Sequence, residues 1–215
     1  CLGLLLLLGR AARAKVFEKH ERVVLAGFAL FYLVCQMAMS QLLRFTPVTD
    51  LEQCYTAAQV LAENARRAGS FLADHTAPRC PVAFYLEKSA PVFAAMLGTV
   101  YAGCCYSVLD TRQPAARTQQ VLSTLQPSLL ITDRDHADAA AALGCSCSVY
   151  LLEELLTAAV EPSLLAARRA QAVDVDPLYI NFTSGSTGVP KGVTVSHRSV
   201  LDFIPQFAAI FGIKA

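Results

Sequence analysis

Two short apolar runs enclose a loop of small and hydroxyl-bearing residues in the stretch Tyr179-Ile180-Asn181-Phe182-Thr183-Ser184-Gly185-Ser186-Thr187-Gly188-Val189-Pro190-Lys191-Gly192-Val193-Thr194-Val195. The first run predicts a buried strand, and the alternating Val193-Thr194-Val195 predicts a second one. Backbone N–H groups in so small a loop can approach an anion closely, its hydroxyls can donate, and Lys191 adds a positive charge. The stretch therefore predicts a phosphate-binding loop between two strands. An ordinary hairpin turn, which Gly, Ser and Thr also favour, is the alternative.

The order of residues in this loop separates it from other phosphate-binding motifs. It lacks the Gly-Lys-Ser/Thr of a Walker motif, and no helix is predicted to begin at Lys191. Its order is two hydroxyl residues, Gly, two hydroxyl residues, Gly, any residue, Pro and Lys. This order resembles the phosphate-loop signature of the adenylate-forming (AMP-binding) enzymes. That superfamily contains acyl-CoA synthetases, luciferases and the adenylation domains of nonribosomal peptide synthetases.

A second motif adds to the resemblance. The run Ala102-Gly103-Cys104-Cys105-Tyr106-Ser107-Val108-Leu109-Asp110 is similar to the family's Ala-Gly-x-x-Tyr-x-Pro-Leu-Asp motif, with Val108 where proline is usual. Pro114 and Arg117 match the Pro-x-x-Arg that follows it. This motif is structural in the family, so Val108 affects no catalytic step. The particular residues of both motifs favour amino-acid-activating members of the family, namely peptide synthetase adenylation domains and D-alanine–carrier-protein ligases.

The chain alternates between helical and strand patterns from residue 55 onward. Helices are predicted at 57–73, 89–103, 113–125, 136–143, 153–172 (broken around Pro162) and 196–211, and further strands at 81–86, 105–109, 128–132 and 146–151. Continuous apolar strands separated by helices predict an α/β fold, a parallel sheet with helices on both faces. The loop then lies at a strand end, where such folds bind phosphates. The resemblance implies that residues 55–215 are part of the family's large N-terminal domain.

Residues 1–45 form a hydrophobic segment unlike the rest of the chain. Residues 23–43 carry no charge and, at about 1.5 Å per residue, reach about 31 Å, which predicts a transmembrane helix; a buried core helix is the alternative. The basic residues at 10–22 predict that the loop before this helix lies in the cytoplasm. A single crossing would then put the ligase-like region on the other side of the membrane, where ATP is not available. We therefore expect two joined coding regions, with residues 46–54 as a junction. Residues 44–63 also resemble the first outer loop of membrane glycosyltransferases.

Charge and cysteine content exclude some functions. A net charge of +1 argues against a nucleic-acid-binding surface. The eight cysteines contain no Cys-x-x-Cys, and Cys145-Ser146-Cys147 has no second cluster to complete a zinc site. Several cysteines lie among apolar residues, as free buried thiols do, which indicates a reducing compartment. We expect a cytoplasmic AMP-binding region, with membrane association through residues 23–43.

The resemblance implies an ATP-dependent ligase. A carboxylate, here that of an amino acid, attacks the α-phosphorus of ATP, pyrophosphate leaves, and a thiol captures the acyl-adenylate. The implied cofactors are ATP and Mg²⁺, and the implied acceptor is the phosphopantetheine of a peptidyl or acyl carrier protein, or CoA. The implied phosphate-binding residues are Thr183, Ser184, Gly185, Ser186, Thr187, Gly188 and Lys191. No catalytic or metal-binding residue is implied within the chain, because the family's other motifs fall beyond Ala215. We therefore expect the 215-residue chain to be inactive on its own.

Two other functions remain open. A fatty-acyl or aryl CoA ligase shares the loop and the first half-reaction. The other is a membrane protein with a glycosyltransferase-like N-terminus, fused to a non-catalytic AMP-binding remnant. Under this hypothesis the protein is expected in the membrane fraction of the cell. The histidines favour no further chemistry: His197 is expected beside a helix cap, and His20, His75 and His136 in solvent.

Overall fold

The computed structural model describes residues 51–184 and 189–211. The chain divides into two compact units, residues 61–197 and a second unit made of residues 1–60 and 198–215. The larger unit contains the whole sheet and the root of the predicted phosphate loop. The predicted transmembrane helix at 23–43 lies outside the described residues. Within the described residues, no helix has the length and hydrophobicity that a membrane crossing requires.

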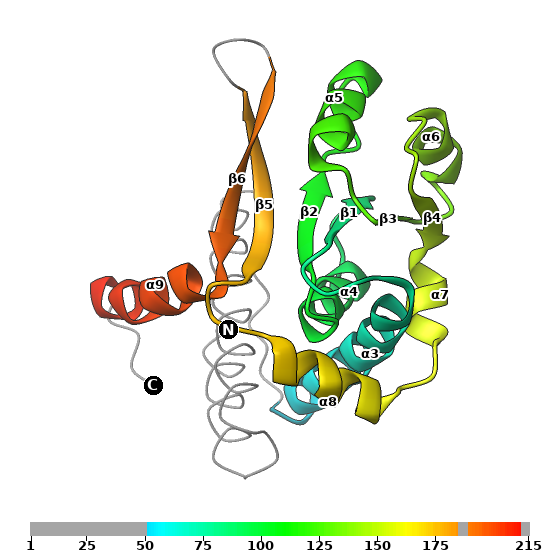
Figure 1. The fold of residues 1–215 in the computed structure, drawn as a ribbon. Helices are drawn as coiled ribbons and strands as arrows, with labels where there is room; N and C mark the ends of the chain where they lie inside the picture. The colour runs from blue at the N-terminus through cyan, green and yellow to red at the C-terminus, as the bar shows by residue number, and fades with distance from the viewer. Residues whose placement is uncertain (1–50, 185–188, 212–215) are drawn as a thin grey trace. The chain divides into compact units, whose positions relative to one another are not determined.

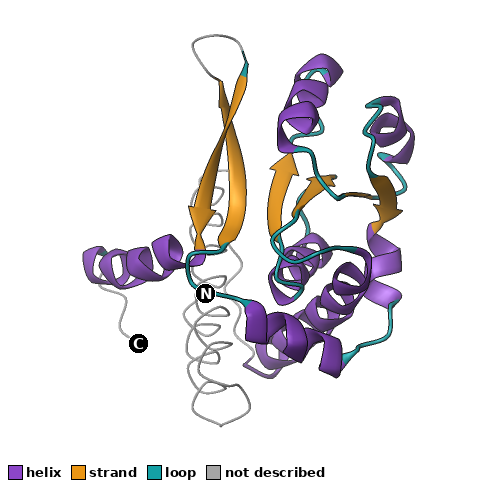
Figure 2. Cartoon of the chain, viewed as in Figure 1, coloured by secondary structure: helices purple, strands orange, loops and turns teal. Residues whose placement is uncertain are grey.

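The larger unit is built on one six-stranded sheet with the order β4-β3-β1-β2-β5-β6 (Figures 1 and 2). The strands are β1 (Pro81–Tyr85), β2 (Cys105–Leu109), β3 (Leu129–Thr132), β4 (Ser148–Leu151), β5 (Pro177–Ser184) and β6 (Pro190–Ser196). Strands β1 to β5 are parallel, and β6 pairs with β5 antiparallel. The predicted α/β fold is thus confirmed, with one antiparallel strand added at an edge of the sheet.

One helix of the larger unit precedes the first strand, and the others connect the parallel strands. They are α4 (Ala90–Tyr101), α5 (Ala115–Leu125), α6 (Ala137–Ala142), α7 (Leu152–Thr157) and α8 (Pro162–Gln171), together with most of α3 (Leu51–His75). Helix α4 links β1 to β2 in one direction across the sheet, whereas α5 (β2 to β3) and α6 (β3 to β4) run in the other direction. Because such crossovers are right-handed, α4 covers one face of the sheet, and α5 and α6 cover the other. The break predicted around Pro162 in a long helix corresponds to the gap between α7 and α8.

The core on the face of α5 and α6 is a continuous apolar cluster. Ala83 and Tyr85 are two residues apart on β1, and their registered partners Leu130 on β3 and Leu109 on β2 are also members, so all four lie on one face of the sheet. The cluster consists of Ala83, Tyr85, Leu109, Val121, Leu122, Leu125, Leu130, Ala140 and Leu143. Ile180 and Phe182 of β5 pack against it. The strand that leads into the predicted phosphate loop is therefore attached to the central core.

Helices α3 and α4 approach each other closely at two glycines. A Cβ added at Gly98 would lie 2.7 Å from the Ala68 Cβ and 2.9 Å from the Ala65 backbone oxygen. A Cβ at Gly69 would lie 2.9 Å from the Cβ of Tyr101. Distances this short do not occur between real carbon atoms in packed cores, so both positions require glycine.

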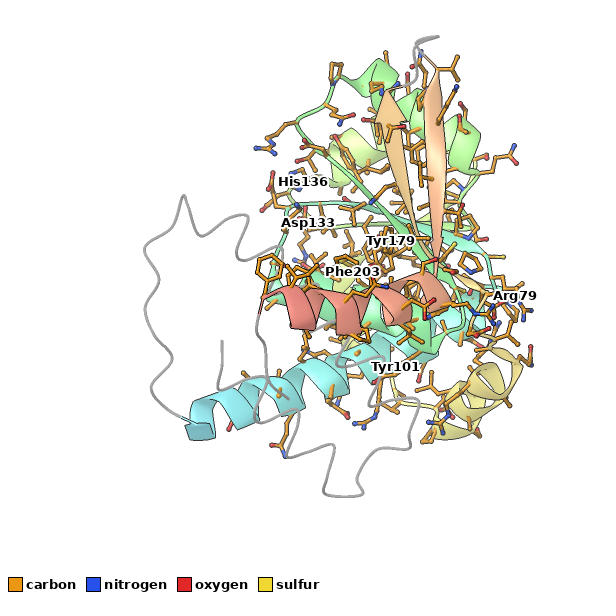
Figure 3. The ribbon with its side chains drawn as sticks, turned by 90° about the vertical axis from the view of Figure 1, so that its left-hand side faces the viewer. Arg79, Tyr101, Asp133, His136, Tyr179 and Phe203 are labelled. Carbon is orange, nitrogen blue, oxygen red and sulfur yellow. A yellow bond between two sulfur atoms is a disulfide. The ribbon has the colours of Figure 1, made fainter. Side chains whose placement is uncertain are left out.

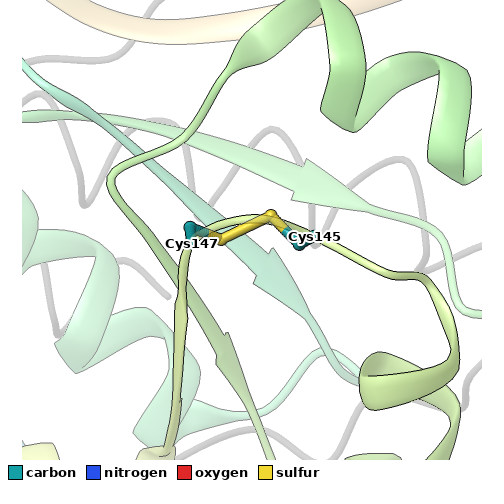
Figure 4. The surroundings of a disulfide bond; sticks show 2 residues. All are labelled: Cys145 and Cys147. Atoms are coloured by element: carbon teal, nitrogen blue, oxygen red, sulfur yellow. A yellow bond between two sulfur atoms is a disulfide. The ribbon is translucent and has the colours of Figure 1, made fainter.

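The described part of the chain contains both free and disulfide-bonded cysteines, and Cys80 is a half-buried free thiol. Cys104 and Cys105 are buried free thiols, as expected, and burial raises the pKa of Cys105 to about 11. Cys145 and Cys147 instead form a disulfide on the connection from α6 to β4 (Figure 4). Both half-cystines pack against the apolar cluster. The sequence pattern does not indicate this bond.

The described part of the smaller unit includes residues 198–210 of helix α9 (His197–Ile210). The rings of Phe203 and Phe207 lie 5.5 Å apart, and those of Phe207 and Phe211 lie 4.4 Å apart, between centroids. This row of aromatic rings at four-residue spacing confirms the helical pattern predicted for 196–211.

Candidate functional site

The predicted phosphate loop connects the two strands of the β5–β6 hairpin. Thr183 pairs with Lys191 and Ser184 pairs with Pro190, so these pairs form the root of the loop. Gly185, Ser186, Thr187 and Gly188 lie outside the described residues. Strands β5 and β6 form the antiparallel hairpin that the sequence also allowed, and the root of the loop lies at the carboxyl end of β5. This end of a parallel strand is where α/β folds bind ligands.

The two faces of the hairpin carry different residues. Directly opposed residues in an antiparallel pair have their side chains on the same face, so Thr183 and Lys191 share one face. Both are exposed at the loop root. The other face carries Phe182 opposite Gly192, where an added Cβ would lie 3.3 Å from the Phe182 ring. Gly192 therefore leaves room for the ring, which packs on the core, while the polar pair remains accessible.

One residue outside the hairpin contacts the root of the loop. Nη2 of Arg117, in the first turn of α5, donates a hydrogen bond to the backbone oxygen of Thr183 at 3.3 Å. The sequence indicates Arg117 only through the Pro-x-x-Arg spacing after β2, and that spacing gives it no role. The contact joins residues 66 positions apart. Local sequence patterns therefore could not predict it.

The end of β2 forms a polar turn next to β5. Asp110 accepts hydrogen bonds from the backbone nitrogen of Arg112 at 3.0 Å and from its Nε at 3.1 Å. These bonds hold the pKa of Asp110 below its usual value. Thr111 donates to Glu87 at 2.9 Å, which links the ends of β1 and β2. The second sequence motif thus ends in a turn that stabilises the carboxyl edge of the sheet.

His136 contacts an acidic residue at the end of β3, where solvent was expected. Its Nδ1 lies 2.6 Å from a carboxylate oxygen of Asp133, and its backbone nitrogen donates to the same oxygen at 2.9 Å. The ring also packs edge-on to Tyr85, and Figure 3 shows Asp133 and His136 side by side. Asp133 thereby closes the turn before α6. The expectation of a solvated His136 is wrong, because its side chain is only 23% exposed.

Another ionic cluster lies at the amino end of β5, away from the loop. Arg79 donates from Nε to a carboxylate oxygen of Asp176 at 2.7 Å and from Nη2 to the backbone oxygen of Gln171 at 2.9 Å. Burial alone raises the pKa of Asp176, but hydrogen bonds from Arg79 and the Val173 backbone outweigh it and lower that pKa. The backbone nitrogen of His197 donates to the backbone oxygen of Asp176 at 3.1 Å. Burial lowers the pKa of His197, partly opposed by the Asp176 charge.

Comparison with known proteins identifies the family. The sequence profile of the AMP-binding enzyme family matches residues 44–213. The chain is 33% identical over 196 residues to pyochelin synthetase PchF of Pseudomonas aeruginosa, covering 90% of this chain and 10% of that protein. It is 32% identical over 146 residues to malformin synthetase mlfA of Aspergillus sclerotiicarbonarius, covering 68% of this chain and 3% of that protein. The chain belongs to the AMP-binding enzyme family.

Solved structures agree with this assignment. The AMPPNP-bound form of the nonribosomal peptide synthetase FmoA3 superposes with a TM-score of 0.60 at 26% identity. The match covers 72% of this chain and 16% of that one. The chain thus spans a small part of the relatives that it matches.

Proposed function

We propose that the protein carrying this chain uses ATP to activate a carboxylic acid, specifically an amino acid, as an acyl-adenylate. The observation that carries this proposal is the loop root, where Thr183 and Lys191 share an exposed face at the carboxyl end of β5. Membership of the AMP-binding enzyme family supports ATP as the nucleotide. The match to amino-acid-polymerising synthetases supports an amino acid as the substrate class.

The chemistry assigned to the loop is phosphate positioning. A carboxylate oxygen of the substrate attacks the α-phosphorus of ATP, and the bond to the bridging oxygen breaks, releasing pyrophosphate. Negative charge then accumulates on the departing β- and γ-phosphates, where fixed donors and cations lower the barrier. Lys191 provides such a cation. The remaining donors in this proposal are Thr183, Ser184, Gly185, Ser186, Thr187 and Gly188.

The second half-reaction is transfer to a thiol. The sulfur of a phosphopantetheine on a carrier protein attacks the acyl carbonyl, and AMP leaves. ATP use supports a cytoplasmic location. Mg²⁺ would neutralise charge on the triphosphate, but residues 51–184 and 189–211 contain no group of three or more His, Cys, Asp or Glu side chains that could hold a metal ion.

The test is amino-acid-dependent exchange between pyrophosphate and ATP in the full-length protein. Replacing Lys191 with alanine removes the cation at the loop root, so the exchange rate should fall by roughly 100- to 1,000-fold, the loss typical of removing one charge-stabilising group. Binding of the adenosine part of ATP should change much less, because Lys191 is assigned to the phosphates. Binding of ATP and of adenosine would be measured separately by calorimetry.

Lys88→Ala is the matched control. Lys88 is likewise an exposed lysine, but it follows β1, which lies two strands away from β5 in the sheet. Its removal should leave exchange within about twofold of wild type, because surface charges away from the site contribute little. Equal losses of ATP affinity and exchange rate in Lys191→Ala would contradict the assignment of Lys191 to pyrophosphate handling.

A further inference from the structure

The last residues of β5 extend beyond the strand that holds β5 in the sheet. The parallel pairing with β2 is registered at Tyr106 and Tyr179. Continued along the two strands, this register places Leu109, the last residue of β2, level with Phe182. Thr183 and Ser184 therefore lie past the end of β2, and Figure 1 shows the hairpin continuing beyond it. The pairing between β2 and β5 therefore does not hold the root of the loop in place.

Helix α5 lies beside this extended part of the hairpin. It contacts β6, and its buried Val121, Leu122 and Leu125 belong to the apolar cluster that also holds Ile180 and Phe182. The helix begins after Pro114, whose oxygen accepts the backbone N–H of Arg117 at 2.9 Å. Arg117 thus projects from a well-anchored first turn. The core holds Phe182, and the hydrogen bond from Arg117 holds Thr183, the next residue towards the loop.

We propose that Arg117 is a positioning residue, which holds the root of the phosphate loop through the Thr183 backbone oxygen. Thr183 is the registered partner of Lys191, so fixing the Thr183 backbone also fixes the position from which Lys191 reaches the phosphates. A hydrogen bond from a charged donor is stronger than one between neutral groups, which suits a contact near the surface. This inference rests on the proposed function and adds a residue that itself touches no nucleotide.

The experiment compares Arg117→Ala, Arg117→Lys and wild type in the full-length protein. Hydrogen exchange followed by mass spectrometry reports the mobility of the hairpin, and pyrophosphate–ATP exchange reports its chemistry. We expect Arg117→Ala to increase deuterium uptake in peptides from 177–196. Its kcat should fall by about tenfold with the KM for ATP changed less than about threefold, because a misplaced group costs rate more than ground-state binding. Lysine keeps the charge and one donor for the Thr183 oxygen, so Arg117→Lys should restore most of both readouts.

Arg134→Ala is the matched control, because it removes an arginine whose side chain is 77% exposed from the connection that precedes α6. It should leave both readouts near wild type. Unchanged uptake in Arg117→Ala would overturn the inference, and so would a higher KM for ATP with unchanged kcat, which would indicate direct phosphate binding. If the wild-type protein shows no exchange with any acid, the proposed function fails. Deuterium uptake then decides the role of Arg117 by itself.

Discussion

At the residue scale, Gly98 illustrates how packing outweighs helix propensity. Alanine is favoured over glycine inside a helix by about 1 kcal/mol. A Cβ added at position 98 would meet two backbone atoms, the Gly69 nitrogen at 2.7 Å and the Ala65 oxygen at 2.9 Å. Because these are backbone atoms, no side-chain rotation can relieve the clash. Overpacking of this kind costs about 1–3 kcal/mol and more when helices must separate. We expect Gly98→Ala to lower the free energy of unfolding, measured by urea denaturation. An unchanged or raised stability would contradict this close approach of α3 and α4.

His197 makes stability depend on pH. Its pKa is lowered from 6.5 in the folded protein, chiefly by burial, so the unfolded chain binds the proton more readily. As pH falls through 6.5 the unfolded state gains protons first, and stability decreases until the folded pKa is passed. We expect the unfolding free energy to decline on acidification from pH 7 towards pH 5. His197→Gln should flatten that decline, whereas an equal slope in both proteins would show that His197 is not its source.

At the element scale, the connection from α6 to β4 is the least predictable part of the fold. The disulfide between Cys145 and Cys147 closes a loop of sequence separation 2, so the entropic gain should be about 1–2 kcal/mol, low for a disulfide. The double variant Cys145→Ser, Cys147→Ser should therefore unfold at lower urea than oxidised wild type and match reduced wild type. Alkylation of the unfolded protein followed by mass spectrometry should show both cysteines protected before reduction. Free thiols at both positions would contradict the bond.

Local pattern predicted most elements and missed the contacts between them. Strands β1 to β4 follow from apolar runs, and β2 was predicted with both of its observed bounds, Cys105 and Leu109. Pro162 marked the break between α7 and α8 because its ring cannot continue a helix. The bond from Arg117 to Thr183 depends on which elements become neighbours in space. No periodicity of the sequence encodes that.

The candidate site was predictable to a similar extent. The order of small residues, hydroxyls and lysine indicated phosphate binding, and the structure adds that Thr183 and Lys191 are paired across β5 and β6. Histidine was the weakest prediction. Ring packing and the carboxylate of Asp133 hold His136 against the end of β3, although its charged sequence neighbours had suggested solvent.

At the scale of the whole molecule, the α/β unit carries the root of the predicted phosphate loop on its β5–β6 hairpin, at one edge of the sheet. The AMP-binding profile begins at residue 44, just after the apolar segment at 23–43, whose crossing of a membrane stays a prediction outside the described residues. The chain spans 3% and 10% of the two synthetases compared above. Substrate choice therefore has to be measured on the full-length protein.

Trapping of the acyl-adenylate tests the central claim most directly. The full-length protein would be incubated with ATP, Mg²⁺, hydroxylamine and a panel of amino, fatty and aromatic acids. We expect a hydroxamate of an amino acid, with AMP and pyrophosphate formed in equal amounts. A hydroxamate of a fatty or aromatic acid would keep the chemistry and indicate the CoA-ligase alternative. Release of ADP and phosphate, or no acid-dependent product at all, would contradict the central claim.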